Sequence, residues 1–438
     1  MRFSRLVLAA ALAAACGPAG AVDLLTVYRD AVVSDATYQS ARAQYQATRE
    51  RLPQARAGYL PIITGTASAF HNDVNLEIAP DQRYSTNSYA VTLSQPIFRM
   101  QNWIAISQAD KLVFQAEANL ALAGQDLILR AAQTYFDVLL AQDNVALSGA
   151  QKSAISEQLA QAKRNFEVGT STIVDTLEAQ ARFDQSVAKE ISDQNDLEVR
   201  KRFLAVLLGK LPEALAPLRD PLALMEPKPA SIEDWVKGGL DASLSIAVAR
   251  ASYDVAQQEI DRQKAGHLPT VDLSASYGHV YDQSSAVPGI VGPNSLTGTV
   301  GVTLSLPIFT GGLTQSRVRE AVALRDKAKE DLENTQRVVA QTIRQQYLNV
   351  TSGIAQVKAL EQALASTQGQ LDSTILGRDV GVRTSVDVLN AQQQVFQTRR
   401  DLQQARYSYL LSTLRLKAAT GTLNDADVEA VNRTLVRG

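Results

Sequence analysis

The residues best placed for chemistry in this sequence are two aspartates, whose carboxylates could cap a helix, pair with a cationic side chain or attract cations. Each lies in one copy of a repeated segment, VGTSTIVDTLEAQ over Val168–Gln180 and VGVRTSVDVLNAQ over Val380–Gln392, with eight of 13 positions identical. Asp175 and Asp387 each follow a threonine by three residues, which is the spacing of a capping box. By residue type alone, both carboxylates are therefore predicted to cap helices.

Other reactive side chains form no catalytic or metal-binding pattern. The histidines His71, His267 and His279 are scattered without metal-ligand spacing, and the single cysteine is Cys16. The sequence has no glycine-rich phosphate loop, no nucleophile elbow and no carboxylate pair clustered outside the predicted helices. We therefore expect no enzyme activity, cofactor or metal site, and a net charge of −2 gives no reason to expect nucleic-acid binding.

The repeated segment belongs to a larger duplication. Gly58–Pro61 (GYLP) recurs as Gly266–Pro269 (GHLP), and Leu93–Phe98 (LSQPIF) recurs as Leu304–Phe309 (LSLPIF). The two aspartates lie 212 residues apart, because 387 − 175 = 212, and the other two pairs have nearly that offset. A period of this size predicts two domain-sized copies, which we place at 22–208 and 239–420.

Long helices must position the aspartates. Ile97–Phe166 and Leu313–Leu376 are far longer than ordinary globular helices, and a second helix follows each, at Thr172–Leu208 and Thr384–Thr420. In the last helix, apolar residues recur every seven positions, at Val388, Val395, Leu402, Tyr409 and Leu416. Such heptads predict supercoiled helical hairpins, and a rod of about 70 residues would be roughly 100 Å long. Shorter helices are predicted at Asp23–Arg56 and Leu240–Ala265.

Strand patterns precede each long helix. Apolar and small polar residues alternate over the segments 84–95, 271–281 and 299–306. Ile62–Ile78 also alternates, but its parity slips near Phe70, which predicts a β-bulge or bend there. A Gly/Pro/Ser-rich loop is predicted at 282–295. Four tyrosines are candidates for an aromatic girdle, namely Tyr84, Tyr89, Tyr277 and Tyr281.

The remaining segments are a predicted signal peptide at 1–21, a proline-rich connector at 209–238 and a C-terminal tail at 421–438. The signal is indicated by Arg2 and Arg5, an apolar run and a small-residue cleavage site at Ala19–Ala21. The alternative is that Cys16 becomes a lipid-anchored first residue. Cleavage after residue 21 would instead leave an exported chain without cysteine.

Four strands cannot close a transmembrane barrel, because such barrels need eight or more strands and an open sheet edge is not tolerated in lipid. If the strands span a membrane, the chain must oligomerise, and two, three or four copies are compatible with closure. The alternative is a soluble periplasmic coiled-coil scaffold or adaptor with strands in an ordinary sandwich. One strand face consists almost entirely of Ser, Thr, Gly and Asp, which favours a water-filled lumen.

Several long segments closely resemble the TolC family of outer-membrane exit ducts, namely GHLPTVDLSAS at 266–276, LSLPIFTGG at 304–312, VGVRTSVDVLNA at 380–391 and ARYSYLLSTLRLKAATGTLN at 405–424. The resemblance covers essentially the whole chain after the predicted signal. It implies an α + β membrane protein and a homotrimer, in which four strands per chain build a 12-stranded transmembrane β-barrel. Antiparallel coiled coils would form an α-helical barrel through the periplasm, with the connector and tail in an equatorial region.

The resemblance also implies location and partners. The chain would lie in the outer membrane of a Gram-negative bacterium, in contact with its lipid. It would dock onto a periplasmic adaptor (membrane fusion) protein and an inner-membrane transporter of the ABC, RND or MFS class. Its role would be tripartite efflux or type I protein secretion through a gated tunnel, and the sequence does not identify the exported substrate.

The resemblance assigns gate roles to residues near the repeated motif. Asp387 matches the first aspartate of a ring that constricts the periplasmic entrance, and Asn390 stands at the second ring position, so one carboxylate ring would be replaced by a neutral one. Arg383 and Asp175 match a link between the two helical hairpins. Gln158 matches one partner of a second link, whose tyrosine is replaced by Arg378. Arg378 could contact Gln158, or instead Asp379 or a neighbouring chain.

Overall fold

The computed structural model describes residues 21–76, 79–211, 214–282 and 294–436. The chain divides into two compact units. The first unit comprises Met1–Arg42, Leu120–Ser245 and Gln336–Gly438, and the second comprises Ala43–Asn119 and Ile246–Thr335. The predicted signal peptide and the alternative lipid anchor at Cys16 lie outside the described residues, apart from Ala21.

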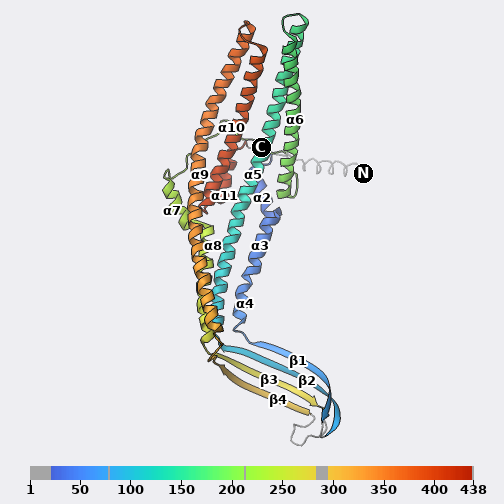
Figure 1. Ribbon diagram of the computed structural model, residues 1–438, viewed down its shortest axis with the longest axis vertical. Helices are drawn as coiled ribbons and strands as arrows, with labels where there is room; N and C mark the ends of the chain where they lie inside the picture. Colours follow the sequence, from blue (N-terminus) through green and yellow to red (C-terminus); the bar gives the residue numbers. More distant parts are fainter. Residues whose placement is uncertain (1–20, 77–78, 212–213, 283–293, 437–438) are drawn as a thin grey trace, which may run out of the picture. The chain divides into compact units, whose positions relative to one another are not determined.

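Two helical hairpins have most of their length in the first unit. Helix α5 (Met100–Glu167) is followed by α6 (Ile173–Leu208), and α9 (Leu313–Asp379) is followed by α10 (Ser385–Ala419). Figure 1 shows α5 beside α6 and α9 beside α10 toward their connecting turns. All four predicted long helices are confirmed to within a few residues at each end.

The heptad predicted for the last helix faces the interior. Its five apolar positions are all buried, as are the small residues Ala391, Thr398 and Ala405 that follow three of them by three residues. Small side chains at these positions let neighbouring helix backbones approach closely.

Two predicted helices are interrupted. The segment Asp23–Arg56 forms three helices, α2 (Leu24–Ser34), α3 (Ala36–Arg49) and α4 (Arg51–Ala57). Asp35 has an extended backbone at the first break, and its carboxylate accepts a hydrogen bond from the Tyr38 backbone N–H. A local cap that satisfies backbone donors can end a helix even where composition favours continuation.

The second interruption lies at Ser243, which separates α7 (Ile232–Ala242) from α8 (Leu244–Lys264). The serine has an extended backbone and its N–H donates to the Gly239 carbonyl. Helix α7 therefore begins inside the segment predicted as an irregular connector.

Among the described residues, no helix is both long and apolar enough to cross a membrane.

The second unit contains a four-stranded antiparallel sheet in the order β1-β2-β3-β4. The strands are β1 (Ile62–Leu76), β2 (Ala79–Phe98), β3 (Thr270–Asp282) and β4 (Asn294–Ser305), and they lie side by side in Figure 1. All four predicted strands are present. Most of the predicted 282–295 loop lies outside the described residues.

The β-bulge predicted at Phe70 is wrong. Phe70 pairs with Thr86 in continuous register, and the shift in the β1–β2 ladder lies between Val74 and Leu76. Phe70 projects from the polar face and its side chain is 61% exposed. An aromatic residue can lie on an exposed polar face. The apolar residue at position 70 therefore interrupts the alternation of residue types without shifting the register of the strand.

The connector is tied to both ends of the described chain. Near the N-terminus, Ala216 N donates to Val22 O at 3.0 Å, and Val22 N donates to Ala214 O at 2.8 Å. Near the C-terminus, Val436 N donates to Pro217 O at 2.8 Å. Tyr135 on α5 is fully buried and donates its hydroxyl to the carbonyls of Ala216 and Val22, at 2.8 and 3.2 Å. The tail itself contains a short helix, α11 (Asp425–Asn432).

Candidate gate at the hairpin turns

The repeated motif forms the two turns that close the helical hairpins. Gly169 and Gly381 have φ angles of 76° and 80°, a left-handed conformation that glycine adopts without steric cost. Thr172 and Thr384 then begin α6 and α10 as N-caps in a β conformation. Both turns therefore have the same construction, as their sequence identity predicts.

Each motif aspartate completes a capping box. The Asp387 carboxylate accepts from Thr384 N and Thr384 Oγ1, both at 2.9 Å, and Asp387 N donates to Thr384 Oγ1 at 3.1 Å. Asp175 repeats the pattern with Thr172, at 3.0, 2.8 and 3.3 Å. The predicted capping role is confirmed for both residues.

These contacts keep both carboxylates ionised. The backbone N–H of Thr384 is the main cause of the lowered pKa of Asp387, with further contributions from the Thr384 hydroxyl and the charge of Arg383. The pKa of Asp175 is lowered chiefly by the Thr172 N–H and also by Ser171. Hydrogen bonds and positive charges favour the charged form of a carboxyl group, so the turns carry fixed negative charges at neutral pH.

Among the described residues of a single chain, no hydrogen bond or ion pair joins Arg383 to Asp175. Asp175 instead accepts from Ser171 Oγ at 2.8 Å in addition to its capping contacts. The Arg383 side chain is exposed and lies against Gly377, where an added Cβ would come within 2.8 Å of the arginine Cγ. The predicted link between Arg383 and Asp175 is therefore not an intrachain contact, and its role in gating stays a prediction.

Arg378 contacts Asp379 and Gln161 rather than Gln158. Its guanidinium forms an ion pair with Asp379 at 2.8 Å and donates to Gln161 Oε1 at 3.3 Å. Gln161 lies about one helical turn beyond Gln158 on α5, so among the described residues Gln158 is not the partner of Arg378. Asp379 was one of the alternatives left open by the sequence.

Asn390 has a partner that the sequence did not predict. Its amide oxygen accepts from Arg182 Nη2 at 3.1 Å, and Gln393 Oε1 accepts from Arg182 Nη1 at 2.9 Å. Arg182 lies on α6 of the other hairpin. The only signal in the sequence was an arginine four residues after Glu178, which alone indicates an ordinary i,i+4 pair.

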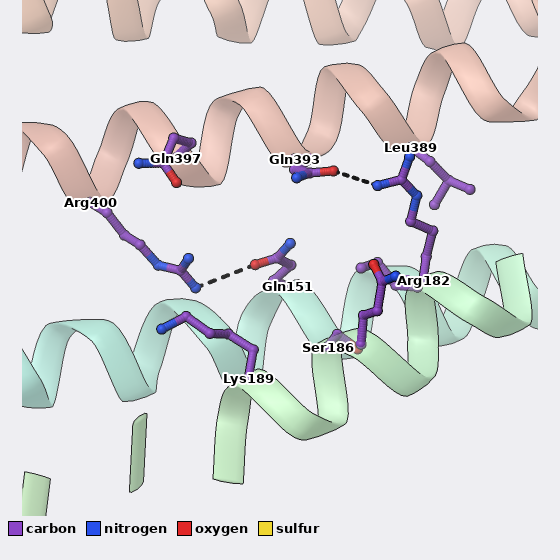
Figure 2. A pocket seen from close by; sticks show the side chains of 10 residues that line it. Gln151, Arg182, Ser186, Lys189, Leu389, Gln393, Gln397 and Arg400 are labelled. Atoms are coloured by element: carbon purple, nitrogen blue, oxygen red, sulfur yellow. Dashed lines mark hydrogen bonds between the residues drawn. The ribbon is translucent and has the colours of Figure 1, made fainter. Parts of the chain in front are cut away.

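Apolar contacts join the two hairpins beside these polar ones. Ile155, Leu159 and Ala162 of α5, Ala179 of α6 and Leu389 of α10 form one buried cluster. Next to it is a cavity of about 220 Å³ lined by α5, α6 and α10. Figure 2 shows Arg182 and Lys189 entering from one side, with Gln393, Gln397 and Arg400 opposite.

Comparison with known proteins places this geometry among outer-membrane channels. The family model described as outer membrane efflux protein matches residues 27–210 and 236–422, nearly the two predicted repeats. Outer membrane protein TolC of Vibrio cholerae is 34% identical over 98% of both chains. The alkaline protease secretion protein AprF of Pseudomonas aeruginosa is 31% identical over 95% of this chain and 88% of its own. Crystal structures of CusC, concerned with folding and transmembrane channel formation, match with a TM-score of 0.79 at 19% identity, over 91% of this chain and 92% of that one.

Proposed function

This chain belongs to the outer membrane efflux protein family and is an exit duct of the Gram-negative outer membrane, and we propose that three copies assemble into its conducting form. Three four-stranded sheets would supply 12 strands, enough to close a barrel in the membrane. The helical hairpins would continue the duct on the periplasmic side. A soluble periplasmic scaffold is not supported, because the similar proteins are outer-membrane proteins.

The exposed apolar face of the sheet carries this proposal. The ladder register places Ile63, Val91, Tyr277, Val300 and Val302 on one face, and each is more than half exposed, Val300 by 77%. The other face presents a row of hydroxyls, Thr64, Thr92, Ser276 and Thr299. Neither face is covered by other parts of the chain as a core would be. The apolar face is suited to contact lipid outside a barrel, and the hydroxyl face is suited to contact water inside it.

For the gate, we propose that the Asp387 carboxylates of the three copies form a ring at the hairpin turns, with Asn390 as a neutral ring one turn away. The capping contacts support this role because they fix the position of Asp387 and keep it charged. Since Arg383 and Asp175 do not meet within a chain, their link would join Arg383 to Asp175 of the partner subunit.

Channels of this family work with periplasmic adaptors and inner-membrane transporters. We propose that this chain does the same, with an adaptor of the membrane fusion class and a transporter of the ABC, RND or MFS class. AprF is a protease secretion protein, which supports protein export as one use of this duct. A metal-resistance relative, CzcC of Cupriavidus metallidurans, supports export of small solutes as well.

Planar lipid bilayers test the duct directly. Purified wild-type protein is expected to form discrete ion-conducting pores, and the same preparation should migrate as a trimer in detergent. Absence of pores from a folded trimer would contradict the proposed duct. The variant Arg383→Ser tests the link between copies, because loss of that link should raise the conductance of each pore; unchanged conductance would refute the link but not the duct.

A further inference from the structure

We propose that Arg182 ties the two helical hairpins of each chain together beside the gate and places a positive charge at the Asn390 position, so that it controls both opening and ion selectivity. This inference rests on the proposed function, because it names a residue that regulates that duct. Arg182 lies outside the repeated motif, and neither its residue type nor its spacing indicates a gate.

The contact has the geometry of a specific link. A planar guanidinium presents parallel N–H donors, and Arg182 uses two of its nitrogens on two acceptors of α10, Asn390 at 3.1 Å and Gln393 at 2.9 Å. These acceptors are three residues apart and therefore on one face of the helix. Figure 2 shows the Arg182 side chain reaching from α6 to Gln393 across the cavity.

Other polar contacts between the hairpins near their turns are longer. Arg378 reaches Gln161 at 3.3 Å, and Arg400 reaches Gln151 at 3.4 Å. Each of these is a single hydrogen bond near the upper distance limit, and Arg400 adds a longer ion pair with Asp193 at 3.9 Å. In this part of the described chain, Arg182 alone makes two short hydrogen bonds from one hairpin to the other, so its loss should weaken the junction most.

The guanidinium of Arg182 lies directly beside Asn390 and is the charged group that contacts it. Glu178 on the same helix forms an ion pair with Arg182 Nη2 at 3.8 Å, so its carboxylate offsets part of this positive charge. Lys189 lies nearby on α6 and is paired with Asp193, while Arg400 on α10 is 3.9 Å from that same aspartate. Where the family has a second carboxylate ring, this chain therefore has an amide held by a guanidinium.

The internal repeat shows why the link occurs once per chain. Glu178 and Asn390 are equivalent positions, 212 residues apart, and Arg182 lies within reach of both. The equivalent of Arg182 in the second copy is Gln394, and the equivalent of Gln393 in the first copy is Ala181. A reciprocal link by a guanidinium from α10 to α6 cannot form, because glutamine replaces the arginine and alanine replaces one acceptor.

The test compares single-channel open probability and reversal potential for three variants of the full-length trimer. Arg182→Gln removes both the charge and the guanidinium fork. Arg182→Lys keeps the charge but cannot make both contacts in the same geometry. Arg399→Gln is the control, since Arg399 donates to Gln368 at 3.3 Å within a single hairpin, from α10 to α9.

Arg182→Gln is expected to raise open probability roughly five- to tenfold, the effect of losing about one net hydrogen bond, and to shift the reversal potential toward cation preference. Arg182→Lys should raise open probability while leaving the reversal potential unchanged, and Arg399→Gln should change neither. If wild-type protein forms pores and Arg182→Gln changes neither their open probability nor their reversal potential, this inference is refuted but the proposed duct is not. Absence of wild-type pores would overturn the duct itself.

Discussion

At the scale of single residues, the capping role of Asp387 can be separated from its proposed role in the gate. Asparagine at this position can still accept the hydrogen bonds from Thr384, but it carries no charge. We therefore expect Asp387→Asn to keep the helix start and lose most of the cation preference of the pore, measured as the reversal potential in a salt gradient. Asp175→Asn is the matched control, because it changes the same capping box in the other turn.

The pH dependence of selectivity follows from the lowered pKa of Asp387. A carboxyl group with a depressed pKa stays charged until the pH falls through that lower value. Cation preference should therefore persist from neutral pH to below about pH 4, because the pKa of Asp387 lies below the ordinary value for aspartate. Loss of preference well above this pH would show that another group dominates selectivity.

Buried Tyr407 and partly exposed Asp143 form a pair between the hairpins, and loss of their contact should destabilise the protein. The Tyr407 hydroxyl donates to Asp143 Oδ2 at 2.8 Å, while burial raises the pKa of Asp143 despite that hydrogen bond. We expect Tyr407→Phe to destabilise the protein by about 1–3 kcal/mol at neutral pH, because a desolvated carboxylate loses its donor.

The measurement for this pair is thermal or denaturant unfolding at several pH values. The penalty of Tyr407→Phe should shrink as the pH falls through the raised pKa of Asp143, since a protonated carboxyl group leaves no unpaired charge. In an Asp143→Asn background the same substitution should cost less. Equal penalties in both backgrounds would exclude coupling between the two side chains.

At the scale of elements, the hairpin turns depend on one glycine conformation. Gly381 has a φ of 80° with no atom near the position of a Cβ, so alanine there is opposed by backbone conformation alone. We expect Gly381→Ala to cost about 1–2 kcal/mol. Gly369→Ala, inside α9 and equally unobstructed, should instead stabilise by about 0.5–1 kcal/mol.

Unfolding midpoints of the two alanine variants, compared with wild type under one set of conditions, test this pair. The opposite signs are the informative result, because both substitutions add the same methyl group to the same region. Two destabilising effects of equal size would mean that packing between subunits, rather than φ, decides the outcome.

At the scale of the whole molecule, strands β1 and β4 are the open edges of the four-stranded sheet. Closure by three copies would place β1 of one copy beside β4 of the next. We expect Thr64→Cys combined with Thr299→Cys, treated with bis-maleimides of increasing length to span the stagger of strands in a closed barrel, to give covalent dimers and trimers on denaturing gels. Both positions lie in one row of the ladder on the hydroxyl face.

The control for the cross-link places both cysteines on neighbouring strands of one chain. Ser276 and Thr299 pair directly between β3 and β4, so Ser276→Cys with Thr299→Cys should give only cross-links within a chain. Oligomeric bands from the control but not from the edge pair would refute edge-to-edge assembly.

Much of this architecture could be predicted because its signals are local. The heptads of Thr384–Thr420, the alternation of the four strands and the Thr-x-x-Asp caps depend on residues a few positions apart, and the structure has all of them. The interruptions at Asp35 and Ser243 were missed, because a single extended residue can end a helix without altering the composition around it.

What only the tertiary structure decided is which side chains meet across the hairpins. Arg378 reaches Gln161 instead of Gln158, and Arg182 reaches Asn390 and Gln393. A long side chain spans about one helical turn in either direction, so its partner depends on the axial offset of the facing helix. The sequence by itself determined the duplicated hairpins, their turns and their charged caps, because these depend on neighbours along the chain. The contacts between hairpins depend on how separate helices pack, and packing is a property of the folded chain.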